Sequence, residues 1–375
     1  MMQTTPPPQR GLAQWAKRAV LGLTDRFSYP LRLSHYVELV NPLWATHALQ
    51  ARVVAVWDET QNARTLTLKP GLNWRGFRAG QHLRVGIPVG GRHFTRTYTI
   101  SSPPERDDGC FTITVKALEG GSVSHHLVRR IRVGDHLPIG LPQGDFHLPD
   151  AVPVRPLFIT AGSGVTPVMS MLRSLIAQER LVDTVHIHYA PHEFDAIFGQ
   201  GLTQLAQEHP RYAYRPVYTR SFGGPGSTEG HFSAEQLERL CPDWRDREVY
   251  ACGPQSLLTA LETHFEQAGR SRHLHTERFR ATLASVPVNA VGGTVRFSQA
   301  GVDAQADAST SLLRVAEQAG LNPAHGCRMG ICHACDTRLV SGCVRDLRTG
   351  KLHSDAGSII QPCVCAASGD CAIDL

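Results

Sequence analysis

Five of the ten cysteines in this chain of 375 residues lie between positions 327 and 363. Three of them, Cys327, Cys332 and Cys335, follow the spacing C-x4-C-x2-C. Cysteine thiolates are metal ligands, and clustered cysteines in a chain without a signal-peptide pattern are typical of metal or redox sites. A structural zinc site would use two short C-x2-4-C pairs, and this segment holds one. The segment therefore favours an iron–sulfur cluster over zinc.

The C-x4-C-x2-C spacing is that of plant-type [2Fe–2S] ferredoxins. Gly330, between the cysteines, would let backbone amides approach the sulfides and donate hydrogen bonds. The preceding segment 311–320 resembles the helix before the cluster loop of that family. Cys363 resembles the family's fourth cysteine because it lies seven residues before Asp370, which opens the last strand, whereas Cys365 matches the loop length better. We predict Cys363 as the fourth ligand, with Cys365 as the alternative.

A second group of residues can hold a flavin. Arg96-Thr97-Tyr98-Thr99 ends a β-like segment and resembles the R-x-Y-[S/T] signature of the ferredoxin–NADP reductase superfamily. In that signature the arginine can clamp the pyrophosphate, the tyrosine can lie against the isoalloxazine, and the hydroxyl can reach flavin N5. The segment 116–124 resembles the family's phosphate-binding turn and helix start. The resemblance implies FAD bound by Arg96, Thr97, Tyr98, Thr99, Lys116, Gly120, Gly121, Ser122, Val123, Ser124 and Phe279, with Thr99 also catalytic.

A glycine-rich loop follows the apolar segment 156–161 and opens a helical segment, where backbone amides can bind phosphate. Pro167 replaces the third glycine of G-x-G-x-x-G, and no acidic residue follows a strand end about 20 positions later, so an ordinary dinucleotide-binding domain is disfavoured. The loop instead resembles the superfamily's G-x-G-x-T-P, and residues 252–254 resemble its turn beside the nicotinamide. Residues 276–279 resemble the superfamily segment that brings an aromatic ring near the flavin. The resemblance implies nucleotide contacts from Gly162, Ser163, Gly164, Thr166, Pro167, Cys252, Gly253 and Pro254, with Cys252 either catalytic or a structural thiol.

The choice of nucleotide depends on the pocket for the 2′-phosphate. Thr219 and Arg220 follow a β-like segment, where NADP-selective members of the superfamily carry a hydroxyl and an arginine. Arg220 can pair with a 2′-phosphate, whereas an acidic residue would repel it. We predict NADPH as the nucleotide, with NADH as the alternative.

The elements that must position these groups change along the chain. Residues 48–150 hold short alternating segments between Gly, Pro and Asp turns, which indicates a small antiparallel barrel. Residues 151–280 alternate β-like and helical segments, which indicates a parallel sheet. Residues 281–291 have the composition of a linker before a third domain over 292–375. We expect strands at 51–57, 65–68, 82–87, 97–101, 111–115, 156–161, 185–190, 213–219 and 248–251, and a helix at 168–178.

Domains in this order resemble the hybrid ferredoxin reductases. The resemblance implies a six-stranded antiparallel FAD-binding barrel, a parallel-sheet NAD(P)-binding domain and a C-terminal β-grasp ferredoxin domain. NADPH would deliver a hydride to FAD, and a plant-type cluster near about −400 mV would carry single electrons outward. No side chain is needed as an acid, base or nucleophile.

The electron acceptor is indicated by the overall sequence, including residues 38–44 ahead of the barrel. It most resembles the bacterial reductase partners of acyl-CoA Δ9 desaturases, which implies a membrane-bound di-iron desaturase in fatty-acid metabolism. The alternative is the reductase component of a ring-hydroxylating or demethylating oxygenase. A hypothesis from another class is a non-catalytic redox-sensing or metal-sensing protein, against which two complete cofactor sites argue.

Composition and charge exclude other functions. The formal net charge is +5 without a run of Lys or Arg, so we expect no nucleic-acid partner. No stretch of about 18 apolar residues is present, so we expect no membrane span. We predict a cytoplasmic protein, with a place at the inner face of the membrane through its partner as a further option. The nineteen histidines are scattered, and we expect most of them to be exposed or half-buried side chains rather than metal ligands. No motif specifies an oligomeric state.

Residues 1–47 form an extension that these motifs do not cover. Apolar residues recur at helical spacing within 11–23, which predicts an amphipathic helix. We expect this extension to be a strut packed on the barrel. Docking to a membrane-embedded partner is the alternative.

Overall fold

The computed structural model describes residues 41–44, 49–89, 92–119, 121–220, 230–279, 287, 289–326, 328–330 and 333–375. They belong to two units. The first contains the described residues within 41–89, 98–152 and 166–181, and the second contains those within 92–97, 153–165 and 182–375. The predicted helix at 11–23, Gly120, Cys327, Cys332 and most of the predicted linker lie outside the described residues.

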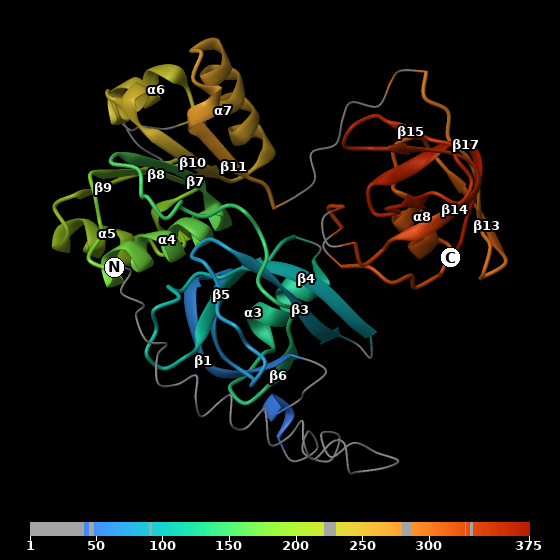
Figure 1. Cartoon of the computed structure of the whole chain (residues 1–375), viewed down its shortest axis with the longest axis horizontal. Helices are drawn as coiled ribbons and strands as arrows, with labels where there is room; N and C mark the ends of the chain where they lie inside the picture. The colour runs from blue at the N-terminus through green and yellow to red at the C-terminus, as the bar shows by residue number, and fades with distance from the viewer. Residues whose placement is uncertain are drawn as a thin grey trace, which may run out of the picture. The chain divides into compact units, whose positions relative to one another are not determined.

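Alternating apolar and polar residues between positions 50 and 140 form six antiparallel strands (Figure 1). The strands are β1 (Gln50–Thr60), β2 (Ala63–Pro70), β3 (His82–Val89), β4 (Arg92–Thr99), β5 (Phe111–Lys116) and β6 (His136–Pro138). One sheet has the order β5-β2-β1-β6, and β3 pairs with β4. Isolated bridges between Val85 and Ile139 and between Ile100 and Ile113 join the two sheets. This arrangement confirms the predicted six-stranded antiparallel barrel.

The barrel encloses an apolar core. Leu66, Ile87 and Ile113 are fully buried, and each contributes on the order of 1.5–3 kcal/mol of transfer free energy. Helix α3 (Ser122–Arg129) adds Val123 and Leu127 to the buried apolar set. The short helix η1 (Pro42–Trp44) precedes the barrel.

Helix α4 (Val165–Ala177) is joined to the barrel by polar contacts within the first unit. The Ser170 hydroxyl donates to the Ser102 carbonyl at 2.6 Å, and the Ser174 hydroxyl donates to Glu105 at 2.9 Å. The helix begins earlier than the predicted helix at 168–178 and ends one residue before it. These bonds fix the helix that opens at the glycine-rich loop.

Five strands form a parallel sheet in the second unit, in the order β11-β10-β7-β8-β9. They are β7 (Pro156–Ala161), β8 (Thr184–Ala190), β9 (Tyr212–Tyr218), β10 (Glu248–Cys252) and β11 (Leu274–Glu277). Every residue of β8 is buried, as expected for a parallel sheet covered on both faces. On one face, Trp244 and Phe265 pack in one core with Ile159 and Ile187. The sheet confirms the predicted nucleotide-binding architecture.

Helices lie on both sides of this sheet (Figure 1). Helices α6 (Ala234–Leu240) and α7 (Gln255–Gln267) lie on one side, and α5 (Gly199–Glu208) lies on the other. The Ser233 hydroxyl accepts a hydrogen bond from the amide of Gln236 at 3.2 Å, which fixes the start of α6.

The described C-terminal part is a further sheet of six strands together with helix α8 (Leu312–Gln318). Its strands are β12 (Gly293–Phe297), β13 (Val302–Ala306), β14 (Thr337–Asp346), β15 (Leu352–His353), β16 (Ile359–Ile360) and β17 (Cys365–Ile373). The order is β13-β12-β17-β14-β15, with β12 and β17 parallel and β16 paired to β14. Leu312 and Val315 pack with Phe297 in the core of this sheet. This confirms the predicted β-grasp domain and the predicted helix within 311–320.

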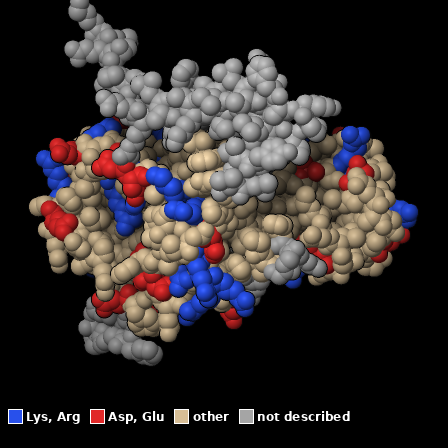
Figure 2. All heavy atoms as spheres, turned by 90° about the horizontal axis from the view of Figure 1, so that it is seen from below, with Lys and Arg blue, Asp and Glu red and all other residues tan. Residues whose placement is uncertain are grey.

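Charged side chains are dispersed on the face shown in Figure 2. Lys and Arg lie in small groups beside Asp and Glu, and uncharged residues cover much of the described surface between them. A surface of this kind gives no extended field of one sign on this face.

Candidate functional site

The two predicted cluster ligands within the described residues lie together. Cys335 and Cys363 are buried, and they pack with Leu313 and Val364. A hydrogen bond from the Cys363 thiol lowers the pKa of Cys335 to about 7, although partial burial opposes the shift. A thiol that ionises this readily suits a metal ligand. In the described part of the chain no group of three His, Cys, Asp or Glu residues is placed to hold a metal ion, and the other two predicted ligands lie outside it.

Cys365, the alternative fourth ligand, has different surroundings. It is buried in the main core of the C-terminal sheet, where it packs with residues such as Leu339 and Ile373. Burial raises the pKa of its thiol to about 12. The structure therefore packs Cys335 with Cys363, whereas Cys365 belongs to the main core of the C-terminal sheet. Cys363 as the fourth ligand stays a prediction.

The cluster loop has the backbone of a tight turn. Arg328, Gly330 and His333 all have positive φ, of 58°, 69° and 55°. Arg328 is held by Glu317 of α8 at 3.0 Å and by the ring of His325 at 2.8 Å. Positive φ at these described residues is compatible with backbone amides that donate hydrogen bonds to the sulfides of a cluster.

The predicted flavin residues of the barrel fall on β4. Alternation along a strand places Arg96 and Tyr98 on one face and Thr97 and Thr99 on the other. Arg96, Thr97 and Tyr98 are half-buried. Thr99 is buried, with 6% exposure. Arg96 donates to the carbonyl of Thr95 at 2.8 Å, so its guanidinium is already oriented along the strand.

The predicted phosphate-binding turn lies between β5, which ends at Lys116, and α3. The Ser124 hydroxyl donates to the Gly121 carbonyl and accepts from the Leu118 amide, both at 3.0 Å. Ser124 therefore holds the turn together, and Val123 packs in the core. The first amides of α3 have no acceptor within the helix and remain suited to a phosphate. Phe279, the remaining predicted flavin contact, follows β11 and is half-buried.

The two predicted nucleotide motifs meet at one edge of the parallel sheet. β7 pairs with β10 in parallel, with Thr160 opposite Cys252, so both turns leave the sheet at the same edge. A β-carbon added to Gly164 would overlap the Cys252 carbonyl oxygen, and one added to Gly253 would lie 3.1 Å from the β-carbon of Ala161. Glycine at these positions permits the close approach of the two backbones.

The rest of the loop matches a phosphate site. Gly162 has a φ of 53°, and a β-carbon there would meet no atom within 4 Å, so the loop has open space beside it. Ser163 is half-buried, and Thr166 and Pro167 are buried in the first turn of α4. Proline costs no hydrogen bond in the first turn, because the first four amides of a helix have no acceptor within it.

Cys252 itself is fully buried. Burial, and then the neighbouring Glu277, raise the pKa of its thiol well above the usual value. The side chain thus stays protonated, which favours the alternative of a structural thiol. Its backbone, followed by half-buried Gly253 and exposed Pro254, forms the contact with the loop.

Thr219 and Arg220 follow β9, as predicted. Their amides donate to the carbonyls of Ala190 and Pro191 at 2.9 and 2.8 Å, which ties them to the end of β8. On that neighbouring segment, the rings of His192 and Phe194 stack at 4.9 Å and 12°, and Phe194 is 73% exposed. Sequence analysis did not identify this aromatic pair, because two rings in a short loop match no motif.

His186 and His188 are buried, and so are exceptions to the expectation that most histidines are exposed or half-buried. The Thr160 hydroxyl lies 2.8 Å from both His186 Nε2 and His188 Nδ1, and His186 Nδ1 lies 2.8 Å from the Tyr212 hydroxyl. These polar groups come from three adjacent strands, and the hydrogen bonds between them offset part of the cost of their burial. Thr160 lies two residues before Gly162, the first glycine of the loop. The network therefore supports the strand β7, which leads into the glycine-rich loop.

Comparison with known proteins agrees with this geometry. Three family models match in order: an oxidoreductase FAD-binding domain over residues 50–148, an oxidoreductase NAD-binding domain over 158–263, and a 2Fe-2S iron-sulfur cluster binding domain over 296–368. An NADPH oxidoreductase of Mycobacterium tuberculosis is 41% identical over 360 residues, covering 95% of this chain and 92% of that protein. The chain belongs to the ferredoxin-reductase-type oxidoreductases. It is an NAD(P)H-dependent oxidoreductase whose cofactors are FAD and a [2Fe–2S] cluster.

Other relatives of this reductase serve oxygenases. A glycine betaine monooxygenase reductase subunit of Pseudomonas aeruginosa is 29% identical, covering 89% of this chain and 98% of that one. The solved structure of phthalate dioxygenase reductase has the same fold, with a TM-score of 0.60 and 24% identity over 88% of this chain and 98% of that one. Within the described ranges, the reductase has no helix with the length and apolar character of a membrane span.

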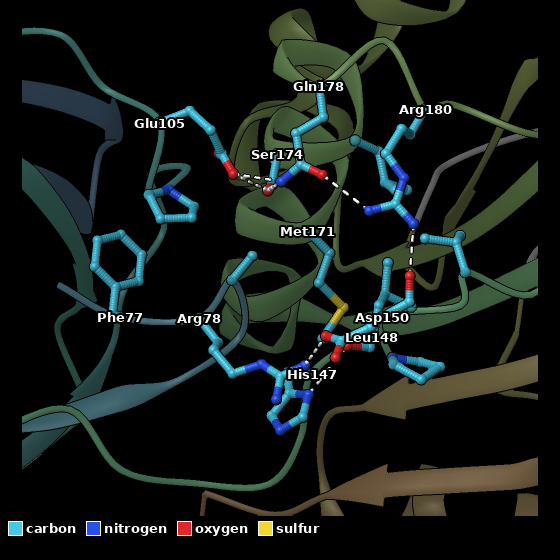
Figure 3. Close-up of a pocket in the computed structure, with 15 residues that line it drawn as sticks. Phe77, Arg78, Glu105, His147, Leu148, Asp150, Met171, Ser174, Gln178 and Arg180 are labelled. Atoms are coloured by element: carbon cyan, nitrogen blue, oxygen red, sulfur yellow. Dashed lines mark hydrogen bonds and ion pairs between the residues drawn. The ribbon is translucent and has the colours of Figure 1, made fainter. Parts of the chain in front are cut away.

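The reductase also contains a cavity of about 190 Å³ in its first unit (Figure 3). Its polar lining groups bond to one another: Arg78 pairs with Asp150 at 2.6 Å, and Arg180 donates to the Asp150 carbonyl at 2.6 Å and to Gln178 at 3.1 Å. Glu105 accepts from Ser174 on α4. None of the predicted cofactor residues lines it, so we interpret the cavity as part of the joint between α4 and the barrel loops.

Proposed function

We propose that this reductase takes electrons from NADPH and supplies them to a membrane-bound di-iron acyl-CoA desaturase of the stearoyl-CoA type. The electron-transfer part of this proposal rests on the close contact between the Gly164 loop and the Cys252 turn. It rests also on the packing of Cys335 with Cys363. A bound FAD accepts a hydride, and a bound cluster passes on single electrons.

The residues of this chain would bind and orient the groups rather than react. The amides around Gly162 and at the start of α4 would hold the nucleotide pyrophosphate, and Arg96 would hold that of FAD. Arg220 would pair with the 2′-phosphate of NADPH. The thiolates of Cys327, Cys332, Cys335 and Cys363 would hold the cluster. The family assignment is one of enzymes, so the hypothesis of a non-catalytic sensor is not retained.

The desaturase is proposed as the specific electron acceptor. It is supported by the sequence resemblance, including residues 38–44. The relative named an NADPH oxidoreductase supports the choice of NADPH as the nucleotide. Delivery to a membrane enzyme would place the reductase in the cytoplasm at the inner face of the membrane. Its role in fatty-acid metabolism would follow from this partner.

A second candidate is the reductase component of a ring-hydroxylating or demethylating oxygenase. The relative from Pseudomonas aeruginosa is named as the reductase subunit of a monooxygenase, and the phthalate dioxygenase reductase shares the fold. The electron-transfer machinery would be the same in both cases. The two candidates differ in the acceptor alone.

Reconstitution separates the candidates. The purified reductase and NADPH are added to an acyl-CoA desaturase in phospholipid vesicles, and formation of the unsaturated acyl-CoA is measured. Parallel reactions contain a ring-hydroxylating or demethylating oxygenase. We expect product with the desaturase and little with the oxygenases. Turnover with an oxygenase and none with any desaturase would refute the desaturase proposal and favour the second candidate.

A further inference from the structure

Arg348 links two segments that carry predicted cluster ligands. It lies in the turn between β14 and β15, remote in sequence from the cysteine loop. Its Nη1 donates to the carbonyl of Gly330 at 2.8 Å, inside the loop, and its Nη2 donates to Gln361 Oε1 at 3.1 Å. Gln361 stands two residues before Cys363. One guanidinium thus spans the gap between the loop and the segment of the fourth ligand.

The orientation of this guanidinium is fixed from behind by Asp346. The carboxylate accepts from Arg348 Nη2 at 2.7 Å and from the backbone amides of Arg348 and Thr349 at 2.7 and 3.2 Å. Asp346 is itself buried, with 9% exposure of its side chain. An arginine with one face held by a buried carboxylate loses little further freedom when it binds the loop.

Gly330 is shaped to receive the arginine. A β-carbon at position 330 would overlap Arg348 Nη1 and lie 2.7 Å from its Cζ and 2.8 Å from Val364 Cγ2. The guanidinium therefore packs directly on the backbone of the loop. Glycine at position 330 thus has two roles: it adopts a positive φ, and it leaves room for the guanidinium of Arg348. The cysteine spacing does not reveal the second role.

The same network continues to the other described ligand. Gln361 Nε2 lies 3.2 Å from His333 Nδ1, and that nitrogen lies 3.0 Å from Asp336 Oδ2. His333 follows Cys332, and Asp336 follows Cys335. His333 Nδ1 can donate to Asp336 or accept from Gln361, one at a time. The bond from Gln361 ties the end of the loop to the network of Arg348, whereas the bond to Asp336 joins the residues that follow Cys332 and Cys335.

We propose that Arg348 is a positioning residue of the cluster, which holds the cysteine loop and the Cys363 segment in register and places a positive charge beside them. This inference rests on the proposed ligands. A fixed cation stabilises the extra negative charge that a cluster gains on reduction, so it raises the reduction potential. Loss of the arginine should therefore both loosen the cluster and lower its potential.

The test compares Arg348→Gln, Arg348→Lys and Arg345→Gln in the full-length protein. Arg345 lies on β14 and donates to Ser368 at 3.3 Å, whereas Arg348 donates to Gly330 of the cysteine loop, so Arg345 is the matched control for loss of one charge. For each variant, iron and sulfide per chain, the rate of cluster loss to a chelator and the midpoint potential are measured. FAD content reports whether the rest of the chain has folded.

We expect Arg348→Gln to lose its cluster roughly ten- to a hundred-fold faster, from the loss of charge-assisted hydrogen bonds. Its potential should shift to a more negative value. Arg348→Lys keeps the charge without the planar fork, so its potential should stay near that of the parent while its cluster loss remains faster. Arg345→Gln should match the parent in both measurements. Parental loss rate and potential in Arg348→Gln would overturn the proposal.

A further variant tests the positioning role if Arg348→Gln cannot be isolated with a cluster. Gln361→Met removes the link to the Cys363 segment and leaves Arg348 in place. We expect faster cluster loss with an almost unchanged potential, and a parental loss rate would overturn the positioning role. Absence of a cluster from the parent itself would instead contradict the proposed function. The two failures are thereby distinguishable.

Discussion

Gly164 of the glycine-rich loop lies so close to Cys252 that a β-carbon at position 164 would overlap the Cys252 carbonyl oxygen. The two residues belong to motifs far apart in sequence, and the parallel pairing of β7 with β10 brings them to one edge of the sheet. The contact is between backbones. It therefore constrains the residue type at 164 more strongly than it constrains the thiol at 252.

Gly164→Ala should impair nucleotide binding. The added methyl group would push the loop away from the Cys252 turn, at a cost of about 1–3 kcal/mol for overpacking. We expect the KM for NADPH to rise about ten-fold or more, with FAD and cluster contents unchanged, in steady-state assays with a small acceptor. Gly201→Ala is the matched control, because a β-carbon at that helical position meets no atom within 4 Å. Equal KM values for the two variants would contradict this role of Gly164.

The choice of the fourth ligand can be tested by two neighbouring substitutions. Cys363→Ser should abolish the [2Fe–2S] signal in absorption and EPR spectra, as should Ser at Cys327, Cys332 or Cys335. Cys365→Ser should retain the cluster, because Cys365 packs in the apolar core, and should cost about 1–3 kcal/mol of stability through a buried hydroxyl. In every variant NADPH should still reduce FAD. A cluster that survives Cys363→Ser and is lost in Cys365→Ser would reverse the assignment.

Much of the fold could be predicted because its signals are local. β7 is an apolar run that ends in glycines, and its predicted bounds 156–161 agree with the structure. The start of β4 was not predicted, since Arg92–Thr95 carries no apolar alternation; the predicted strand at 97–101 covers only its end. Ser311 caps α8 at 3.4 Å from the Arg314 amide, and a serine before an apolar run is a local signal of a helix start.

The parts of the site that escaped prediction depend on contacts between distant residues. Thr160, His186 and Tyr212 form one network only because three strands lie side by side. Likewise, nothing near Arg348 in the sequence indicates that it reaches Gly330. Motifs report the backbone that holds a group, whereas the side chains that support this backbone are selected by topology.

Arg220→Ala should discriminate between the two nucleotides. If Arg220 pairs with the 2′-phosphate, the variant loses a charge-assisted hydrogen bond of about 1.5–3 kcal/mol. The KM for NADPH should then rise roughly ten- to a hundred-fold, while that for NADH stays nearly constant. Phe194→Ala is the companion variant, because it removes an exposed ring from the adjacent segment without changing the charge. It should change both KM values by a similar factor. Equal losses in Arg220→Ala would show that Arg220 acts elsewhere and would remove the argument for NADPH.

The burial of His186 leads us to expect that the free energy of unfolding falls in acid. Burial, and then the neighbouring His188, hold the pKa of His186 well below its usual value. Below about pH 6.5 the unfolded chain binds a proton that the folded chain does not. The free energy of unfolding should therefore be fully present above that pH and fall by up to about 1.4 kcal/mol per pH unit below it.

The measurement is the melting temperature between pH 7.5 and 5. His186→Gln keeps a polar side chain that does not titrate, so its melting temperature should fall less steeply with decreasing pH. His231→Gln is the control, because His231 is exposed, and it should keep the parental slope. The same slope in His186→Gln as in the parent would assign the acid sensitivity to other groups.

Deletion of residues 1–40 tests the role of the N-terminal extension. The adjoining residues already pack on the barrel: the Leu72 amide donates to the Leu43 carbonyl at 3.1 Å, and a β-carbon at Gly71 would lie 2.5 Å from the same oxygen. A segment anchored in this way at its C-terminal end supports the prediction of a strut. We expect the truncated protein to lose part of its FAD and to melt at a lower temperature, because apolar surface of the barrel would become exposed.

The alternative role, docking to a membrane-embedded partner, makes the opposite prediction for the same truncated protein. It would keep its flavin and its melting temperature, reduce a small soluble acceptor at the parental rate, and fail only to deliver electrons to the partner in vesicles. Trp15, Val20 and Leu23 would then form the apolar side of a helix flanked by Lys17 and Arg18, and added salt should weaken delivery by the intact protein. FAD content separates the two roles most directly, since a docking helix has no reason to retain the flavin. A truncated protein with full FAD that fails only with membranes would therefore refute the strut.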